Sequence, residues 1–149
     1  MDKTEKVVLT NMCMIYCENK ILVQDRVKNW KGITFPGGHV NLEESFIKST
    51  IREVKEETGL DVFDLKLCGV KQFTMEDKSF RYIVFCYKTD KFVGEIKSSA
   101  EGEVFWIDKH ELNNYNLASG FKEMFEVFEN DEISESYHWF DKEWKVENL

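Results

Sequence analysis

Apolar and polar positions alternate along most of the chain in two different periods, which predict a mixture of strands and helices. Runs rich in β-branched and apolar residues, bounded by polar turns, predict strands at residues 7–17, 21–26, 65–74, 80–88 and 103–107. Apolar residues at helical spacing predict helices at residues 45–58 and 117–129. This order of elements predicts an α/β fold in which helices cover both faces of one sheet.

The composition favours one acidic globular domain. The 149 residues, 42% of them apolar, suffice for a single core, so we expect one domain spanning residues 1–149. The formal net charge is −8, and residues 120–149 carry −6 of it. Stable binding to nucleic acid needs a basic surface, so this balance disfavours it. If the substrate is an anion, a divalent cation is the obvious source of positive charge.

No segment has the composition of a membrane span or a signal peptide. The longest apolar runs have six residues, whereas a membrane-spanning helix needs about 20. The N-terminal residues lack the apolar core of a signal peptide. Cys13, Cys17, Cys68 and Cys86 lie in apolar runs without a CxxC pair, so we expect buried, reduced thiols and no zinc site. We therefore expect a cytoplasmic protein that does not contact membranes.

The first predicted helix carries three glutamates on one face. At about 100° per residue, Glu56 and Glu57 fall about −60° and +40° from Glu53 around the helix axis. These glutamates repel one another, and they lie near the negative end of the helix dipole. Both effects lower the stability of the folded helix. A bound Mg²⁺ or Mn²⁺ would offset this repulsion, because both ions prefer oxygen ligands. The alternative is a solvated acidic face.

A sharp loop precedes this helix. The run Phe35-Pro36-Gly37-Gly38 lets the backbone turn and approach a ligand closely. Either Asn41 or Ser45 could cap the start of the helix, and Gly59 suits the left-handed position just past its end. A backbone that approaches a ligand beside an acidic helix favours a binding site over a solvated face.

The spacing of these residues resembles the motif of the Nudix hydrolases, G-x5-E-x7-R-E-U-x-E-E-x-G-U, where U is bulky and apolar. It occupies residues 38–60, from Gly38 through Glu44 to the run that begins at Arg52 and ends at Leu60, and every defined position matches. So many defined positions at fixed spacing make the resemblance specific. It implies a Nudix-type α/β/α sandwich with a central mixed β-sheet.

The resemblance also implies a metal site. Nudix proteins hydrolyse a nucleoside diphosphate linked to another moiety and use Mg²⁺ or Mn²⁺. Glu53, Glu56 and Glu57 would then be metal ligands, and Gly37 would lend its backbone carbonyl to the same ion. The ion would neutralise the phosphate chain, orient it and activate a water molecule.

Two further roles follow from the same resemblance. Arg52 and Glu44 would join the loop to the helix and orient Glu53, and the alternative for them is an ordinary surface pair. Glu53 or a carboxylate of a later loop would accept the proton of the attacking water. For the later loop we prefer Glu101 to Glu103, because Glu101 and the following glycine resemble a pair in the MutT branch; the alternative is a solvated loop acid.

The chain lacks three features that mark other substrate classes of the family, and this narrows the range of substrates. The chain has no proline downstream of the motif, as ADP-ribose hydrolases often have, and no tyrosine close behind it, as dinucleoside-polyphosphate hydrolases have. The motif of the coenzyme A branch is also missing. The remaining class, nucleoside triphosphate pyrophosphohydrolases, includes MutT-like enzymes that remove 8-oxo-dGTP.

In that class, five residues are candidates for substrate binding. Phe35 could stack on a base, while Arg26 and Asn116 could form hydrogen bonds with the base or ribose. Gly38 and His39 lie where phosphate would bind. The alternatives are a core position for Phe35 and plain loop positions for Arg26 and Asn116.

The main hypothesis is therefore Mg²⁺-dependent hydrolysis of 8-oxo-dGTP or a related (d)NTP to the monophosphate and pyrophosphate, which sanitises the nucleotide pool. Its alternatives are a Nudix hydrolase of another nucleoside-diphosphate-linked substrate, a non-catalytic nucleotide sensor, and an acidic interaction module. The acidic, aromatic segment 130–149 matches no general family motif. We expect it to close either a core or the interface of a homodimer.

Overall fold

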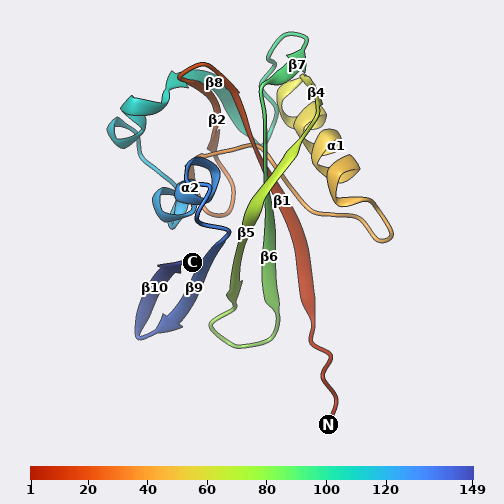
Figure 1. Ribbon diagram of the computed structural model, residues 1–149, viewed down its shortest axis with the longest axis vertical. Coiled ribbons are helices and arrows are strands. Elements are labelled where there is room, and N and C mark those ends of the chain that lie inside the picture. Colours follow the sequence, from red (N-terminus) through yellow and green to blue (C-terminus); the bar gives the residue numbers. More distant parts are fainter.

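The computed structural model describes residues 1–149 and shows one large sheet with a helix on each side (Figure 1). The strands and helices, in chain order, are β1 (Val7–Cys17), β2 (Lys20–Arg26), β3 (Gly32–Thr34), α1 (Phe46–Thr58), β4 (Asp61–Phe63), β5 (Lys66–Thr74), β6 (Arg81–Thr89), β7 (Lys91–Val93), β8 (Gly102–Asp108), a 3₁₀ helix (Lys109–Asn114), α2 (Phe121–Glu129), β9 (Glu135–Asp141) and β10 (Glu143–Asn148). All five predicted strands and both predicted helices are present.

The sheet is mixed, as predicted. Its strand order is β10-β9-β5-β6-β1-β2-β3, and β8 also pairs with β2. The pairs β1–β6 and β5–β9 are parallel, whereas the others are antiparallel. Strand β1 lies along β6 for most of its length and pairs with β2 only near its end, at Tyr16 and Cys17. The sheet therefore opens into two parts between β1 and β2, and both parts are tied to β1.

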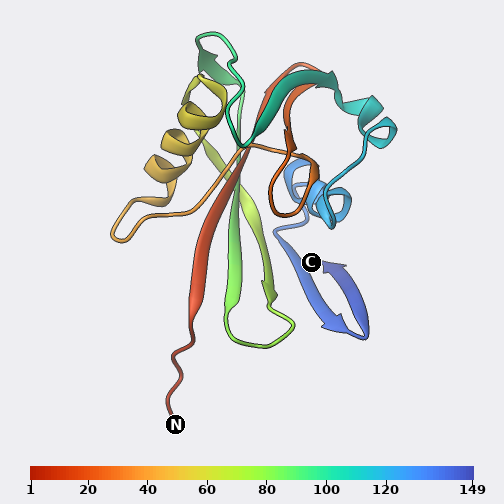
Figure 2. The ribbon, with the colours of Figure 1, turned by 180° about the vertical axis from the view of Figure 1, so that it is seen from behind.

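Helices α1 and α2 lie on opposite sides of the sheet (Figure 2), and a hydrophobic core lies under each of them. Because strand side chains alternate, β1 sends Met14 into the core under α2 and its neighbours Cys13 and Ile15 into the core under α1. Helix α1 contributes Val54, and α2 contributes four side chains including Phe121. Full burial of each large apolar side chain contributes about 1.5–3 kcal/mol. The α/β/α sandwich is thus confirmed.

Local signals set the ends of α1. Ser45 has an extended backbone, and its side chain accepts a hydrogen bond from the Lys48 N–H at 3.2 Å. Of the two possible caps, the structure therefore selects Ser45. Asn41 instead forms a turn in which its N–H donates to Glu44 Oε1 at 3.0 Å. Gly59 ends the helix at φ 82°, as predicted.

The acidic, aromatic segment 130–149 contains a hairpin, β9–β10, that the sequence pattern did not predict. Strand β9 pairs with the edge strand β5, so the segment closes the sheet. The residues of β9 that it buries are polar, Ser136 and His138, while Tyr137 and Trp139 stack on each other on the opposite face. Polar and aromatic residues alternate along β9, but the polar ones are buried, which is the reverse of the usual strand pattern.

The second helix is shorter than predicted. It begins at Phe121 and not at residue 117, because Leu117 and Ala118 lie alongside β3 and pair with its backbone. The Ala118 N–H donates to the Ile33 carbonyl at 3.0 Å, and Gly120 then turns the chain at φ 78°.

Strands β3, β4 and β7 were not predicted. They have three residues each, which is too short for a period to be visible in the sequence.

The cysteines are all free, but one of them is not buried as expected. Cys13 and Cys86 lie in the cores and Cys68 is half-buried, whereas Cys17 is exposed at the end of β1. The prediction for Cys17 was wrong because the buried positions of β1 end at Ile15, and Cys17 is the last residue of the strand. None of the helices is long and apolar enough to cross a membrane.

Candidate active site

The loop before α1 runs close against β1. The Asn11 N–H donates to the Gly38 carbonyl at 2.9 Å, the Cys13 N–H donates to the Pro36 carbonyl at 2.9 Å, and the Gly38 N–H donates to Asn11 Oδ1 at 3.1 Å. A Cβ atom on Gly37 would overlap the Asn11 carbonyl, and one on Gly38 would overlap the Glu53 carboxylate. Glycine is needed at both positions because the loop approaches β1 and the Glu53 carboxylate closely, whereas the sequence pattern had suggested a close approach to a ligand.

Glu57 lies beneath this loop and is 5% exposed. Its Oε2 accepts a hydrogen bond from the Gly37 N–H at 2.9 Å, and it forms no ion pair. Burial raises the pKa of Glu57 to about 7; the Gly37 hydrogen bond opposes this shift, and the neighbouring carboxylate of Glu53 adds to it. A buried carboxylate without a cation is unfavourable. This is the arrangement that a bound cation would stabilise.

Arg52 connects the loop to the helix, as predicted. Its Nε and Nη2 donate to the two carboxylate oxygens of Glu44 at 2.8 and 3.0 Å, and Nη2 also donates to the His39 carbonyl at 3.1 Å. These hydrogen bonds from Arg52 lower the pKa of Glu44 to about 2. Nη1 of Arg52 lies 3.0 Å from Glu53 Oε1 and 3.3 Å from Glu56 Oε2. Arg52 thus holds two of the three carboxylates of the acidic face, Glu53 and Glu56.

The oxygen atoms around this loop are of the kind that binds Mg²⁺ or Mn²⁺. Gly37 is buried, and its carbonyl accepts no hydrogen bond within the protein. Burial raises the pKa of Glu53, while Glu56 remains mostly exposed. Backbone and carboxylate oxygens suit these two cations. As placed here, no three acidic, histidine or cysteine side chains form a ready cluster, because Glu53 and Glu56 face Arg52 and Glu57 faces Gly37.

A cavity of about 1170 Å³ lies beside these residues. It is large enough for a nucleotide. The predicted site residues in its wall are Arg26, Phe35, Gly37, Gly38, His39, Glu53, Glu56, Glu57 and Glu101. Arg52 and Glu44 do not line the cavity and act only through the glutamates that do. Of the two later acids, Glu101 lies in the wall, whereas Glu103 is exposed outside it on β8.

The structure does not bring two of the predicted base-binding residues into suitable positions. Asn116 is exposed and does not line the cavity; its backbone carbonyl accepts a hydrogen bond from the Ile33 N–H at 2.8 Å. Phe35 is only 1% exposed, and its ring packs edge-on against Phe121 and Phe128, with centroids 4.9 and 5.1 Å away. With both faces in the core, Phe35 offers no surface for stacking on a base.

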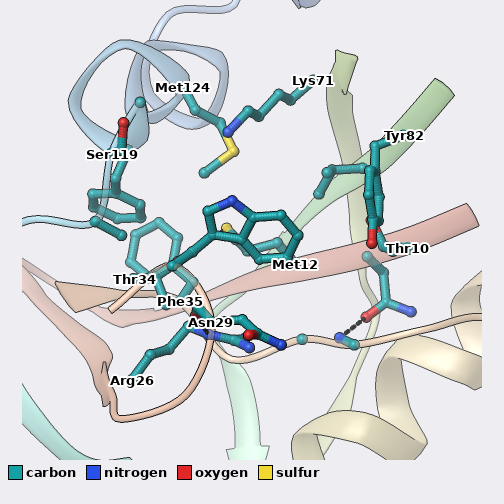
Figure 3. Close-up of a pocket in the computed structure, with 18 of the residues that line it drawn as sticks. Thr10, Met12, Arg26, Asn29, Thr34, Phe35, Lys71, Tyr82, Ser119 and Met124 are labelled. Atoms are coloured by element: carbon teal, nitrogen blue, oxygen red, sulfur yellow. Dashed lines mark hydrogen bonds between the residues drawn. The ribbon is translucent and has the colours of Figure 1, made fainter. Parts of the chain in front are cut away.

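Aromatic rings that the sequence did not single out line another part of the wall. Trp30 meets Tyr82 edge-on at 5.6 Å, Tyr82 stacks on Phe73 at 5.1 Å, and Phe73 meets Trp144 edge-on at 5.6 Å. Figure 3 shows Tyr82, Lys71 and Met124 on one side of the pocket and Arg26 and Asn29 on the other. The one feature of the sequence that could have indicated this aromatic part of the wall was a tryptophan in the polar loop 27–31.

Comparisons with known proteins agree with this geometry. A family model described as NUDIX domain matches residues 8–130. The chain is 26% identical over 107 residues to an 8-oxo-dGTP diphosphatase of Haemophilus influenzae, which covers 72% of this chain and 75% of the relative. It is 35% identical over 102 residues to an ADP-ribose pyrophosphatase of Methanocaldococcus jannaschii, covering 65% of this chain and 57% of the relative.

The fold is also found among solved structures. A MutT protein from Bacillus halodurans superimposes with a TM-score of 0.78, at 23% identity and over 93% of this chain and 94% of the other. At this level of identity the similarity shows a shared fold and not a shared substrate.

Proposed function

The chain belongs to the Nudix family, and from this premise we propose that it hydrolyses 8-oxo-dGTP or a related nucleoside triphosphate to the monophosphate and pyrophosphate. The observation that carries this proposal is a single cavity whose wall combines carboxylates with exposed aromatic faces. The loop and α1 supply Gly37, Glu53, Glu56 and Glu57 for the phosphate chain. Aromatic rings from β5, β6 and neighbouring segments supply a surface for a flat base.

Nudix hydrolases generally require a divalent cation, and the residues here fit Mg²⁺ or Mn²⁺. The carboxylates of Glu53, Glu56 and Glu57 and the free carbonyl of Gly37 would hold it, because all four provide oxygen atoms. The cation neutralises the phosphate chain and makes water a better nucleophile. Support for this assignment comes from the buried Glu57, whose carboxylate has no ion-pair partner.

The remaining work falls to side chains of the cavity wall. Water forms a bond to phosphorus, the anhydride P–O bond breaks, and pyrophosphate leaves with the bonding electrons. Glu53 or Glu101 accepts the proton of the water, since both line the cavity and burial raises the pKa of Glu53. Arg52 keeps Glu53 in place, and Glu44 keeps Arg52 in place.

A second candidate substrate is a nucleoside diphosphate linked to a sugar. The relative named ADP-ribose pyrophosphatase is the observation that favours it. A non-catalytic nucleotide sensor would use the same cavity without turnover. For any of these functions we propose a cytoplasmic setting, which the four free cysteines support.

A panel of nucleotides, incubated with the protein and Mg²⁺, tests the proposed reaction. We expect monophosphate and pyrophosphate from 8-oxo-dGTP or another triphosphate, detected by chromatography with mass analysis. Glu56→Gln and Glu57→Gln should each lower turnover on the order of 100-fold or more, because each removes a charged metal ligand. Glu126→Gln, an exposed glutamate on α2, is the matched control and should turn over normally.

Four outcomes would count against parts of the proposal. Absence of monophosphate with every nucleotide would exclude the hydrolase, and thermal stabilisation by nucleotide without turnover would favour the sensor. Faster cleavage of ADP-ribose than of any triphosphate would favour the second substrate. Unchanged rates in both glutamine variants would remove the metal assignment.

A further inference from the structure

Lys71 on β5 is a cation in the cavity wall that has no partner. Its side chain is half-buried and reaches the pocket beside Met124 (Figure 3). It forms no hydrogen bond or ion pair, and its Nζ lies 5.5 Å from the centre of the Phe73 ring. Burial lowers its pKa, and Glu123, the acid that opposes this shift, is not within ion-pair distance. A half-buried ammonium without an acceptor is unfavourable, so a ligand that accepts hydrogen bonds would stabilise it.

Besides Glu123, which lines the same cavity, the wall near Lys71 contains a histidine and several aromatic rings. His138 lies nearby on β9 and shares a hydrogen bond of 2.8 Å between its Nε2 and Ser136 Oγ. Burial and the charge of Lys71 lower the pKa of His138 to about 4, so it is uncharged at neutral pH. Phe73, Tyr82 and Trp144 add aromatic surface to the same wall. This part of the cavity therefore combines flat apolar surface with one strong donor.

Resting on the proposed function, we propose that this wall is the base subsite and that Lys71 selects a keto purine over adenine. An ammonium group has three donors and no acceptor. Guanine presents two adjacent acceptors, O6 and N7, and 8-oxoguanine keeps the O6 acceptor although its N7 carries a proton. Adenine instead presents an amino donor at the position of O6. The aromatic rings provide stacking for any base, and Lys71 provides the preference.

The C-terminal hairpin completes this subsite. It contributes His138, Trp144 and Val146 to the cavity wall, and it lies beyond residues 8–130 that match the family model. Because β9 pairs with β5 from Val70 to Phe73, it lies directly beside Lys71. The preference for a keto purine is thus built by β5 and the hairpin and not by the acidic motif on α1.

Binding of GMP and AMP to Lys71 variants tests the subsite without requiring turnover. Tryptophan fluorescence is suitable, because Trp30 and Trp144 line the cavity, and calorimetry provides a second readout. We expect the wild type to bind GMP more tightly than AMP. Lys71→Met should weaken GMP binding about tenfold or more and change AMP binding less than about twofold. Lys71→Arg should keep the preference because it keeps the donors.

A control and a second variant guard against a purely structural effect. Lys66→Met changes an exposed lysine on the same strand and should leave both affinities unchanged. Lys71→Gln offers an acceptor as well as a donor, so it should reduce the preference for GMP even if Lys71→Met does not fold. In turnover, the loss in Lys71→Met should appear in KM for 8-oxo-dGTP and dGTP, with little change for dATP.

The two proposals fail in different ways. If no triphosphate is hydrolysed, the proposed function fails, but the comparison of GMP with AMP still decides the subsite. Equal affinity of the wild type for GMP and AMP would overturn the subsite. So would an equal decrease in the affinity for GMP and for AMP in Lys71→Met and Lys71→Gln. Equal loss would show instead that Lys71 contacts the phosphate that both ligands share.

Discussion

Arg52 controls the orientation of the acidic residues through contacts with three glutamates and one backbone carbonyl. Replacement by lysine keeps the charge but cannot reproduce the two parallel hydrogen bonds to Glu44 together with the contact to Glu53. We therefore expect Arg52→Lys and Glu44→Gln each to lower kcat about 10- to 100-fold. Steady-state kinetics and thermal denaturation, measured together, would show whether activity falls more than stability.

The matched control for Arg52 is Lys55 on the same helix. Lys55 forms an exposed ion pair with Asp61 at 3.1 Å, and such pairs contribute little. Lys55→Met should leave kcat unchanged. If Arg52→Lys were as active as the wild type, the role of Arg52 in positioning Glu53 would be wrong.

Among the elements, β9 carries a buried histidine, His138, whose protonation opposes folding. Burial lowers the pKa of His138 from 6.5 to about 4. Between these values the unfolded chain binds more protons than the folded one, so stability is full above pH 6.5 and falls as the pH decreases toward 4. The slope from this group is at most about 1.4 kcal/mol per pH unit. In urea unfolding at pH 7, 6 and 5, His138→Gln should show a shallower decrease than the wild type.

The exposed histidine on the 3₁₀ helix is the control for this effect. His110→Gln should follow the wild-type pH dependence, because His110 is exposed and lies away from the hairpin. Parallel curves for His138→Gln and the wild type would mean that His138 does not cause the acid sensitivity.

At the scale of the whole molecule, β1 couples the candidate metal site to both cores. Its residues pack under α1 and α2, and its backbone forms hydrogen bonds with the loop that contains Gly37. A cation that binds only the folded chain should raise the Tm of the entire protein, because at 100 times its Kd it adds about 2.7 kcal/mol to the free energy of unfolding. Thermal unfolding with Mn²⁺ and then with excess chelator would measure this shift.

The shift should depend on the buried glutamate. Glu57→Gln should remove most of the increase in Tm with Mn²⁺, whereas Glu126→Gln on the far helix should retain it. Equal increases in the two variants would place the cation elsewhere on the acidic surface.

Local patterns were enough to predict the helix that carries the candidate chemistry. Its length, its cap at Ser45 or Asn41, the end at Gly59 and the shared face of the three glutamates all depend on residues a few positions apart. The link between Arg52 and Glu44 was expected from the resemblance to the Nudix motif, and the structure shows it as two hydrogen bonds. The long strands were predictable from their alternation and composition.

Contacts between distant parts of the chain decided the rest. Only the fold brings Lys71 on β5 beside His138 on β9 and places Phe73 against Trp144. Only the fold buries Phe35 among the phenylalanines of α2 and leaves Asn116 outside the cavity. The sequence alone therefore determined the acidic motif and its supporting loop, because periodicity and capping act over short distances. The tertiary structure decided which side chains line the cavity, because strand pairing and burial join residues that the sequence separates.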